Sequence, residues 1–524
     1  MGTYLNPGED KFRMAIQSKI YVDKSGIIAY LNEVFRTEDR FVCVSRPRRF
    51  GKSMAANMIA AYYDRTADVE QEFRELKIGS EPTFSEYLGK YDVIQVNMQV
   101  LLSRSETMAD LLKLLQKSIL WELLDVYPDV RYFDDTDLSR SMSDVYQKTR
   151  RPFVIIIDEW DCIFREYQNR KDWQEKYLDF LRLWLKDQAY VGLAYMTGIL
   201  PIKKCGTHSA LNMFWEYTMT NPGKMAEYVG FTAAEVQGLC EKYAVDFHDC
   251  QTWYDGYFFS ELGEVYNPRS VVAALINGKF DSYWNKTETF EALKIYVEMN
   301  FDGLREAVLA LMSGARQQLD LNSASRGVDE LKSADDVLGM LIQFGYLGYD
   351  FDREEVFIPN QEIRQEFATV VEKGDWDIVA KALKAADALL ASTLAKDSAA
   401  VAQGIENAHL ETSHIQYNDE NALSYTLSLA YYTARQKYYV VRELPTGKGF
   451  ADIVMWPREN HLDLPALILE LKWDKSANTA IRQIKTKKYP EALKDYTGEI
   501  LLVGVSYDKQ TRVHECEIEE WQKE

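Results

Sequence analysis

Cysteine is scarce in this 524-residue chain, and its six copies are scattered, with no CxxC pair among them. That spacing argues against a structural zinc site and against a disulfide framework, and it predicts a reducing, cytoplasmic setting. The chain also lacks a run of about 18 uncharged apolar residues, so we expect no membrane span. Its first residues, MGTYLNPGEDKF, lack the charged-then-apolar pattern of a secretion signal.

Basic residues are in deficit, with 61 Lys and Arg against 81 Asp and Glu, which gives a formal net charge of −20. Such a charge argues against a generic nucleic-acid coat protein, but it leaves a local basic channel open. The hydrophobic share of 47% and the charged share of 27% are those of an ordinary folded protein. A chain of this length exceeds a single core, so we expect about two to four domains.

Short apolar runs alternate with amphipathic segments in the first part of the chain. The runs are FVCV (41–44), YDVIQVNM (91–98), PFVIIID (152–158) and YVGLAYMTG (190–198). Strands that alternate with helices predict an α/β fold with a doubly wound, mostly parallel sheet. We place a first domain at 1–230, a helical region with a turn-rich insertion at 231–400, and a small α/β domain at 406–524. The helical region begins with Thr232 as N-cap and Glu235 three residues later, which is the pattern of a capping box.

A Gly-Lys-Ser sequence follows the first apolar run, in SRPRRFGKS at residues 45–53. A phosphate-binding loop joins a strand to a helix whose N-terminus faces the anion, with the consensus G-x-x-x-x-G-K-S/T. Arg46 stands where the first glycine belongs, while Gly51, Lys52 and Ser53 are in place. In this interpretation Lys52 reaches the terminal phosphates and the Ser53 hydroxyl ligates Mg²⁺. A basic surface loop before an ordinary helix is the alternative.

A second signal lies downstream, where PFVIIID ends in Asp158 and is followed by Glu159. In phosphate-loop enzymes a carboxylate at such a strand end holds Mg²⁺, and the next acid can activate the attacking water. Strands also end in aspartate for a simpler reason, because acids favour turns and helix caps. The combination with a Gly-Lys-Ser loop is much harder to obtain by chance. Thr197, which closes the strand LAYMTG, could supply a polar group near the terminal phosphate, or be a plain strand-end threonine.

Three residues of a different chemistry stand near the C-terminus: Asp452 in GFADIVMW, and Glu470 and Lys472 in ALILELKW. Alternate side chains of a strand share a face, so Glu470 and Lys472 point the same way. An acid and a lysine in so apolar a strand are costly to bury unless they are paired or functional. Carboxylates that hold Mg²⁺ can activate water against a phosphodiester, and a lysine can stabilise the developing charge.

We therefore predict Asp452 and Glu470 as metal ligands and, together with Lys472, as the catalytic set of a PD-(D/E)xK nuclease core. The order of elements agrees, because an Asp-strand, an ExK-strand, a helix and a further strand follow one another. A cross-strand salt bridge on a surface strand is the alternative.

The segments SRPRRFGKSM, IIIDEWDCIF, MTGILPIKK, WYDGY and FIPNQEIRQEF resemble those of the bacterial AAA-ATPase-like family. In that family a nucleotide-binding domain precedes a small nuclease-like domain, and the phosphate loop usually reads RPRRFGKS. The resemblance implies ATP as ligand, with Asp158 and Glu159 in the Walker B roles, and Glu159 as the catalytic acid. We expect the nucleotide to contact Arg49, Phe50, Gly51, Lys52, Ser53, Met54, Asp158 and Thr197, with Ser53 and Asp158 at the Mg²⁺.

For the C-terminal region, the resemblance implies Glu420 as a further metal ligand, with Gln483 and Tyr489 as supporting residues. Glu443 is another candidate acid. By residue type alone, Glu420 is more often an acid on a helix surface.

Together these residues predict an ATP-binding hydrolase whose nuclease-like domain cleaves nucleic acid, DNA or RNA, under the control of ATP. The alternative is a nucleotide-controlled switch that binds nucleic acid or protein without cleaving. No membrane partner is expected, and the oligomeric state stays open. An arginine finger cannot be assigned from the sequence, although Arg46, Arg48 and Arg49 are candidates.

Overall fold

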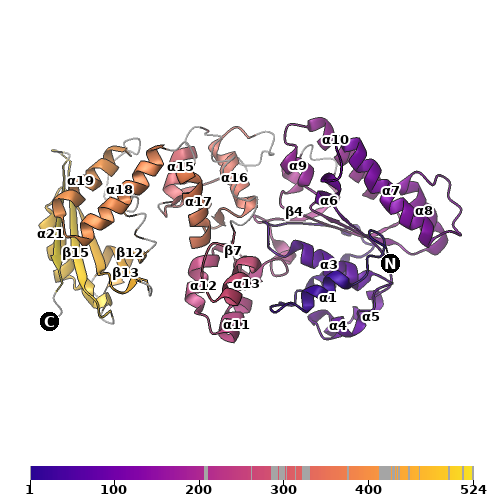
Figure 1. Cartoon of the computed structure of the whole chain (residues 1–524), viewed down its shortest axis with the longest axis horizontal. Coiled ribbons are helices and arrows are strands. Elements are labelled where there is room, and N and C mark those ends of the chain that lie inside the picture. Colours follow the sequence, from indigo (N-terminus) through magenta and orange to yellow (C-terminus); the bar gives the residue numbers. More distant parts are fainter. Residues whose placement is uncertain are drawn as a thin grey trace. The chain divides into compact units, whose positions relative to one another are not determined.

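The computed structural model describes most of the chain (Figure 1). Apart from isolated residues, it describes 2–205, 211–260, 262–284, 304–312, 314–321, 331–373, 377–411, 437–446, 449–458, 461–493, 496–509 and 513–521. The chain divides into two compact units, Met1–Leu304 with Gln318–Glu366, and Arg305–Gln317 with Phe367–Glu524. Within these described ranges no helix has both the length and the apolar character needed to cross a bilayer.

A five-stranded sheet forms the centre of the first unit, with the order β2-β3-β4-β1-β5 and parallel pairing throughout. The strands are β1 (Phe41–Ser45), β2 (Asp92–Asn97), β3 (Phe153–Asp158), β4 (Val191–Gly198) and β5 (Trp215–Tyr217). The predicted α/β fold with a parallel sheet is confirmed, and the first four strands coincide with the four apolar runs. β1, β3 and β4 are buried along their whole length, as expected for strands covered on both faces.

Helices precede and connect these strands. They are α1 (Asp10–Ile16), α2 (Gly26–Val34), α3 (Lys52–Tyr63), α4 (Glu70–Arg74), α5 (Phe84–Tyr87), α6 (Met98–Leu102), α7 (Met108–Val126), α8 (Leu138–Thr149), α9 (Cys162–Glu166) and α10 (Lys171–Leu185). Figure 1 shows α1 and α3 on one side of the sheet, and α6, α7 and α10 on the other. In α7, Leu111, Leu115 and Ile119 recur at a spacing of four and are buried, so the apolar stripe of the helix faces the core.

The rest of the first unit is mostly helical. Its elements include α11 (Ala233–Tyr243), α12 (Phe247–Tyr254), α13 (Pro268–Asn277), α16 (Ala334–Phe344), β6 (Phe231–Thr232), β7 (Tyr257–Phe259), β8 (Gly263–Tyr266), β10 (Gly348–Asp350) and β11 (Glu355–Phe357). The predicted capping box at the start of α11 is confirmed, because Thr232 and Glu235 exchange side-chain bonds to backbone N–H groups. The turn-rich insertion contains the β7–β8 hairpin.

The second unit contains a mixed sheet with the order β12-β13-β14-β15-β16, in which only the β14–β15 pair is parallel among its described pairings. Its elements are β12 (Tyr438–Thr446), β13 (Gly449–Pro457), β14 (Ala466–Trp473), β15 (Ile500–Asp508), β16 (Val513–Glu520), α18 (Asp377–Leu394), α19 (Ser398–Glu411) and α21 (Ala477–Thr486). α17 (Gln361–Lys373) begins in the first unit and continues into the second. A helix predicted at 418–436 lies mostly outside the described residues.

Both faces of β14 are covered. Leu469 and Leu471 pack in a core with residues of α18 and α19, while Ile468 packs in a second core with Ile481 and Ile484 of α21. This alternation places Glu470 and Lys472 on the face that α21 covers, as their spacing predicted. β16 was not predicted, because VHECEIEE is too polar to stand out as a strand.

Candidate functional site

The loop between β1 and α3 has the backbone of a phosphate cradle. Gly51, the residue before α3, has a left-handed φ of +92°, and Arg49 is also left-handed with a φ of +69°. A left-handed residue directly before a helix is best supplied by glycine. The turn directs the first N–H groups of α3 outward, where the helix dipole favours an anion.

Lys52 lies buried within this loop. Its Nζ donates hydrogen bonds to the carbonyl oxygens of Arg46 at 3.0 Å and Pro47 at 2.9 Å. Burial lowers the pKa of Lys52, while the nearby carboxylates of Glu159 and Asp158 act in the opposite direction. A buried ammonium ion held mainly by neutral carbonyls is poised to accept an anionic partner.

Arg46, in the position of the missing first glycine, turns its side chain into the core. Its Nη1 donates to the carbonyls of Ser45 at 3.0 Å and Tyr217 at 3.2 Å, and its guanidinium lies over the ring of Phe259 at 5.1 Å. The side chain is fully buried, and burial lowers the pKa of Arg46 to about 9. The arginine therefore ties the loop to β5 and β7, and it does not line the cavity described next.

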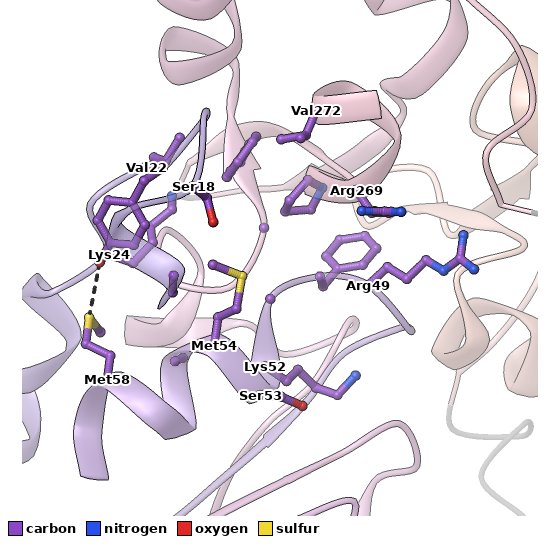
Figure 2. Close-up of a pocket in the computed structure, with 18 of the residues that line it drawn as sticks. Ser18, Val22, Lys24, Arg49, Lys52, Ser53, Met54, Met58, Arg269 and Val272 are labelled. Atoms are coloured by element: carbon purple, nitrogen blue, oxygen red, sulfur yellow. Dashed lines mark hydrogen bonds between the residues drawn. The ribbon is translucent and has the colours of Figure 1, made fainter. Parts of the chain in front are cut away.

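A cavity of about 920 Å³ opens beside this loop (Figure 2). Six of the eight residues predicted at the nucleotide, those from Arg49 to Met54, line it, as does Glu159. The other two, Asp158 and Thr197, are not among the lining residues. Its remaining wall is largely apolar, with Phe12, Ile20, Met58, Phe231 and Val272, although Lys19 and Lys24 also line it. A charged end beside an apolar end matches the chemistry of a nucleotide, which has a polyphosphate and a flat base.

Arg269 is a cavity residue that the sequence reasoning missed. It stands in the first turn of α13, where Asn267 caps the helix by accepting from the Arg269 N–H at 2.9 Å. Figure 2 shows Arg269 and Arg49 at the same end of the cavity. Burial and then the like charge of Arg269 lower the pKa of Arg49. A polyanion bound between two guanidinium groups of one cavity would relieve their mutual repulsion and pair with both. The sequence signal was NPRS, a capped helix start with an arginine in its first turn.

Asp158 ends β3 and is buried. Its carboxylate accepts hydrogen bonds from the Thr197 hydroxyl and from Asn97 Nδ2, the latter at 3.2 Å. The strand order explains both bonds, because β4, which carries Thr197, and β2, which carries Asn97, flank β3. Asp158 and Thr197 are thus brought together as a pair, whereas Asn97 was not foreseen.

Glu159 follows in a left-handed conformation with a φ of +54°. Burial raises the pKa of Glu159, and the charges of Lys52 and Arg165 oppose that rise. The Nη2 of Arg165 lies 2.5 Å from the Oε2 of Glu159. A non-glycine residue in this conformation at the edge of a cavity is a frequent feature of active sites.

The second cluster of predicted residues lies in the mixed sheet. The antiparallel register between β13 and β14 runs from Met455 opposite Leu467 to Ile453 opposite Leu469. Beyond this register, the Asp452 side chain accepts a hydrogen bond from the backbone N–H of Leu471 through Oδ2 at 2.7 Å. The paired register between β13 and β14 ends at Ile453, and this bond places the Asp452 carboxylate next to the backbone of β14.

Glu470 and Lys472 meet on that face. Lys472 Nζ donates to Glu470 Oε1 at 2.9 Å and to the Leu471 carbonyl at 2.8 Å. The other oxygen of Glu470, Oε2, is buried and has no hydrogen-bond partner among the described residues. Burial, reinforced by the charge of Asp452, raises the pKa of Glu470 to about 7. A buried, unpartnered carboxylate oxygen near a second carboxylate fits a divalent cation.

Comparisons with known proteins give a family match in each of the two units. Residues 8–207 match the model of a family described as predicted AAA-ATPase, and residues 420–517 match that of the PD-(D/E)XK nuclease superfamily. The chain thus joins an AAA-ATPase-like domain to a PD-(D/E)XK nuclease-superfamily domain. An uncharacterized protein in the vnfD 5′ region of Azotobacter chroococcum mcd 1 is 25% identical over 278 residues, which cover 51% of each chain. Our chain therefore spans about half the length of this curated relative.

Two solved structures are similar at low sequence identity. A Walker-type ATPase of Pyrococcus abyssi is 14% identical, with a TM-score of 0.34, over 66% of this chain and 94% of its own. The ORC2 protein of Aeropyrum pernix is 12% identical, with a TM-score of 0.32, over 70% of this chain and 98% of its own. The fold of the AAA-ATPase-like domain is given by its own parallel sheet and by the family match.

The remaining candidates of the PD-(D/E)XK domain are only partly placed. Gln483 of α21 donates to Glu470 Oε1 and, at 3.2 Å, to the Tyr489 hydroxyl, so both supporting residues lie at the site. Glu420 and the side chain of Glu443 lie outside the described residues. Among the side chains that are described, no group of three or more His, Cys, Asp and Glu residues is arranged to hold a metal.

Proposed function

We propose that this protein binds and hydrolyses ATP in the cavity beside the phosphate loop, and that its PD-(D/E)XK domain cleaves nucleic acid under the control of that nucleotide. The observation that carries the proposal is the convergence of Lys52, Arg49 and Arg269 with Glu159 on one cavity. The apolar end of that cavity is suited to a base, and its cationic end to a polyphosphate.

Several of the predicted residues have distinct tasks at the nucleotide. Lys52 would exchange its bonds to the loop carbonyls for phosphate oxygens, and the backbone N–H groups after Gly51 would bind others. The Ser53 hydroxyl and Asp158 would hold Mg²⁺, with Thr197 and Asn97 keeping the Asp158 carboxylate in place. When bound, Mg²⁺ would neutralise charge that develops on the phosphates. Glu159 would then deprotonate the attacking water.

At the nuclease site the chain supplies two carboxylates and a lysine. Asp452 and Glu470 would hold a divalent cation, with the Leu471 carbonyl as a further ligand. A bound cation would polarise the phosphodiester and lower the pKa of its water. Lys472, released from Glu470, would orient that water and stabilise the developing negative charge. The presence of all three residues in this chain favours cleavage over binding alone.

Nucleotide binding is tested with Lys52→Ala, and the exposed lysine of α7 in Lys117→Ala is the matched control. We expect Lys52→Ala to lose ATP affinity by at least about tenfold, since a charged group that meets a phosphate directly is removed. Arg269→Ala should also lower the affinity for ATP more than it lowers the affinity for adenosine. Equal ATP affinity in wild type and Lys52→Ala, measured by titration calorimetry, would contradict the proposed site.

Cleavage is tested with Mg²⁺ or Mn²⁺ on plasmid and on single- and double-stranded oligonucleotides of DNA and RNA. Lys472→Ala should abolish it. The control is Lys396→Ala, which should leave cleavage unchanged. Lys396 pairs with Glu499, directly before β15, and with Glu520 at the end of β16. Binding of nucleic acid by wild type without cleavage of any substrate would identify the protein as a nucleotide-controlled switch instead.

A further inference from the structure

Arg165 is a buried arginine next to the predicted catalytic acid, and no task described above uses it. It lies in the short helix α9, and its side chain is 8% exposed. Its guanidinium joins two carboxylates, with Nη2 at 2.5 Å from Glu159 Oε2 and Nε at 3.1 Å from Asp161 Oδ2. Burial lowers the pKa of Arg165, but the charges of Asp161 and Glu159 outweigh that effect and raise the pKa above its ordinary value. The guanidinium is therefore a fixed positive charge.

Asp161 anchors Arg165 to the sheet. Its carboxylate is fully buried, and its Oδ2 also accepts the backbone N–H groups of Ile199 at 3.0 Å and Leu200 at 2.8 Å. These two residues directly follow β4, the strand that carries Thr197. Arg165 is thus held by the rigid frame of the parallel sheet, and it presents its outer nitrogen to Glu159.

Glu159 itself has few other restraints. Its side chain is 22% exposed at the cavity, and a hydrogen bond from its own N–H to Asp158 Oδ1 at 3.1 Å fixes only the backbone. Among the described residues, Arg165 is the one donor to its carboxylate, which it binds through Oε2, while Oε1 accepts no hydrogen bond. The arrangement fixes one carboxylate oxygen and leaves the other available to the cavity.

We propose that Arg165 is a positioning residue, which holds Glu159 Oε2 so that Oε1 orients the water for ATP hydrolysis. The inference rests on the proposed ATPase function. In the reaction, the water oxygen forms a bond to the γ-phosphorus while its proton passes to Glu159 Oε1. The bond between the γ-phosphorus and the β,γ-bridging oxygen breaks, and its electron pair stays with ADP. Arg165 touches neither reactant, and it acts by fixing the geometry of the base.

The variant that tests this is Arg165→Gln, compared with Arg182→Gln, which breaks an exposed pair to Asp179 on α10. We expect Arg165→Gln to lower kcat by about 10- to 100-fold, since a small displacement of a catalytic group costs that much. The Kd for ATP should stay within about threefold of wild type, because Arg165 does not line the cavity. Arg165→Lys should recover part of the loss, since an ammonium ion can hold one carboxylate oxygen. Arg182→Gln should match wild type in both quantities.

A double-mutant cycle separates positioning from a general structural role. In a Glu159→Gln background, Arg165→Gln should lower kcat by less than about twofold, because the group that it positions is already gone. Retained ATP affinity shows that each variant is folded, and Arg165→Lys carries the test if Arg165→Gln is unstable. An unchanged kcat in Arg165→Gln, or a full additive loss in the Glu159→Gln background, would overturn the inference alone. A wild-type protein that neither binds nor hydrolyses ATP would instead refute the proposed function.

Discussion

Single residues account for the departure of the phosphate loop from its consensus. Arg46 occupies the position of the first glycine, yet its side chain is buried. It donates hydrogen bonds to the Ser45 and Tyr217 carbonyls and packs on Phe259. The loop therefore keeps the cradle at Gly51 and Lys52 while it gains a connection to the strands beside it. A rule based on the glycine alone would reject a loop whose geometry is intact.

Restoring the consensus with Arg46→Gly should accordingly destabilise the protein. The change removes a fully buried side chain and leaves a cavity, for which we expect a loss of about 2–4 kcal/mol in the free energy of unfolding. Arg36→Gly is the matched control, because Arg36 is exposed and has a left-handed φ of +59°, which glycine tolerates. Denaturant unfolding of both variants checks this prediction. An Arg46→Gly protein as stable as wild type would contradict a stabilising role for the buried Arg46 side chain.

Glu362 at the start of α17 gives a pH dependence that can be measured. It accepts the Ser270 hydroxyl at 3.0 Å and the N–H groups of Tyr283 at 2.7 Å and Trp284 at 2.9 Å, and burial raises its pKa to about 7. The folded state therefore binds a proton that the unfolded state has already lost between pH values of about 4.5 and 7. Across that window the contribution of Glu362 to stability falls as the pH rises, by at most about 1.4 kcal/mol per pH unit.

Glu362→Gln keeps an acceptor for the two N–H groups and removes the titration. The free energy of unfolding of this variant, relative to wild type, should increase from pH 5 to pH 8. Glu241→Gln, an exposed residue of α11, serves as the control. A difference between Glu362→Gln and wild type that stays constant over this range would show that Glu362 does not titrate there.

At the scale of elements, periodicity and capping signals predicted most of what the structure shows. The four apolar runs became β1 to β4, and the Asp-strand and ExK-strand became β13 and β14. The prediction failed where the signal was short or polar, as in β5 with its three residues WEY and in β16 with VHECEIEE. Such strands are specified by the sheet edge that they join rather than by their own composition.

The start of α11 offers a test of the capping signal. Thr232→Ala removes the side-chain bond to the Glu235 N–H, and we expect a loss of about 1 kcal/mol in the free energy of unfolding. Ser476→Ala is a suitable control, because Ser476 holds the same position before α21 but makes no side-chain capping bond. Thermal unfolding compares the two, and equal effects would mean that the capping box contributes nothing measurable.

The site was less predictable than the fold. The sequence predicts Lys52, Ser53, Asp158, Glu159 and the nuclease trio as site residues, because each stands in a short motif with a fixed chemical reason. Arg165, Arg269 and Asn97 were not predicted, because they reach their sites from separate elements, and only the packing of those elements brings them there. Arg165 stands four residues after Asp161, and Arg269 stands in the first turn of α13. Neither position in the sequence indicates which residue the arginine contacts.

At the scale of the whole molecule, two chemistries share one chain. The first unit, which contains the AAA-ATPase-like domain, carries a cavity with converging cations. The PD-(D/E)XK domain carries a buried carboxylate with an unpartnered oxygen. α17 begins in the unit that holds the cavity and continues into the unit that holds the carboxylate.

The most direct test of this account is the cleavage rate of supercoiled plasmid by the full-length protein at fixed Mg²⁺, measured with and without ATP, in wild type and Lys52→Ala. We predict that ATP changes the rate in wild type by at least about fivefold, the lower end of typical coupling between two sites. Lys52→Ala should cleave at one rate whether or not ATP is present. Cleavage by wild type that does not respond to ATP, in a protein that binds ATP, would contradict the claim that the nucleotide gates the nuclease.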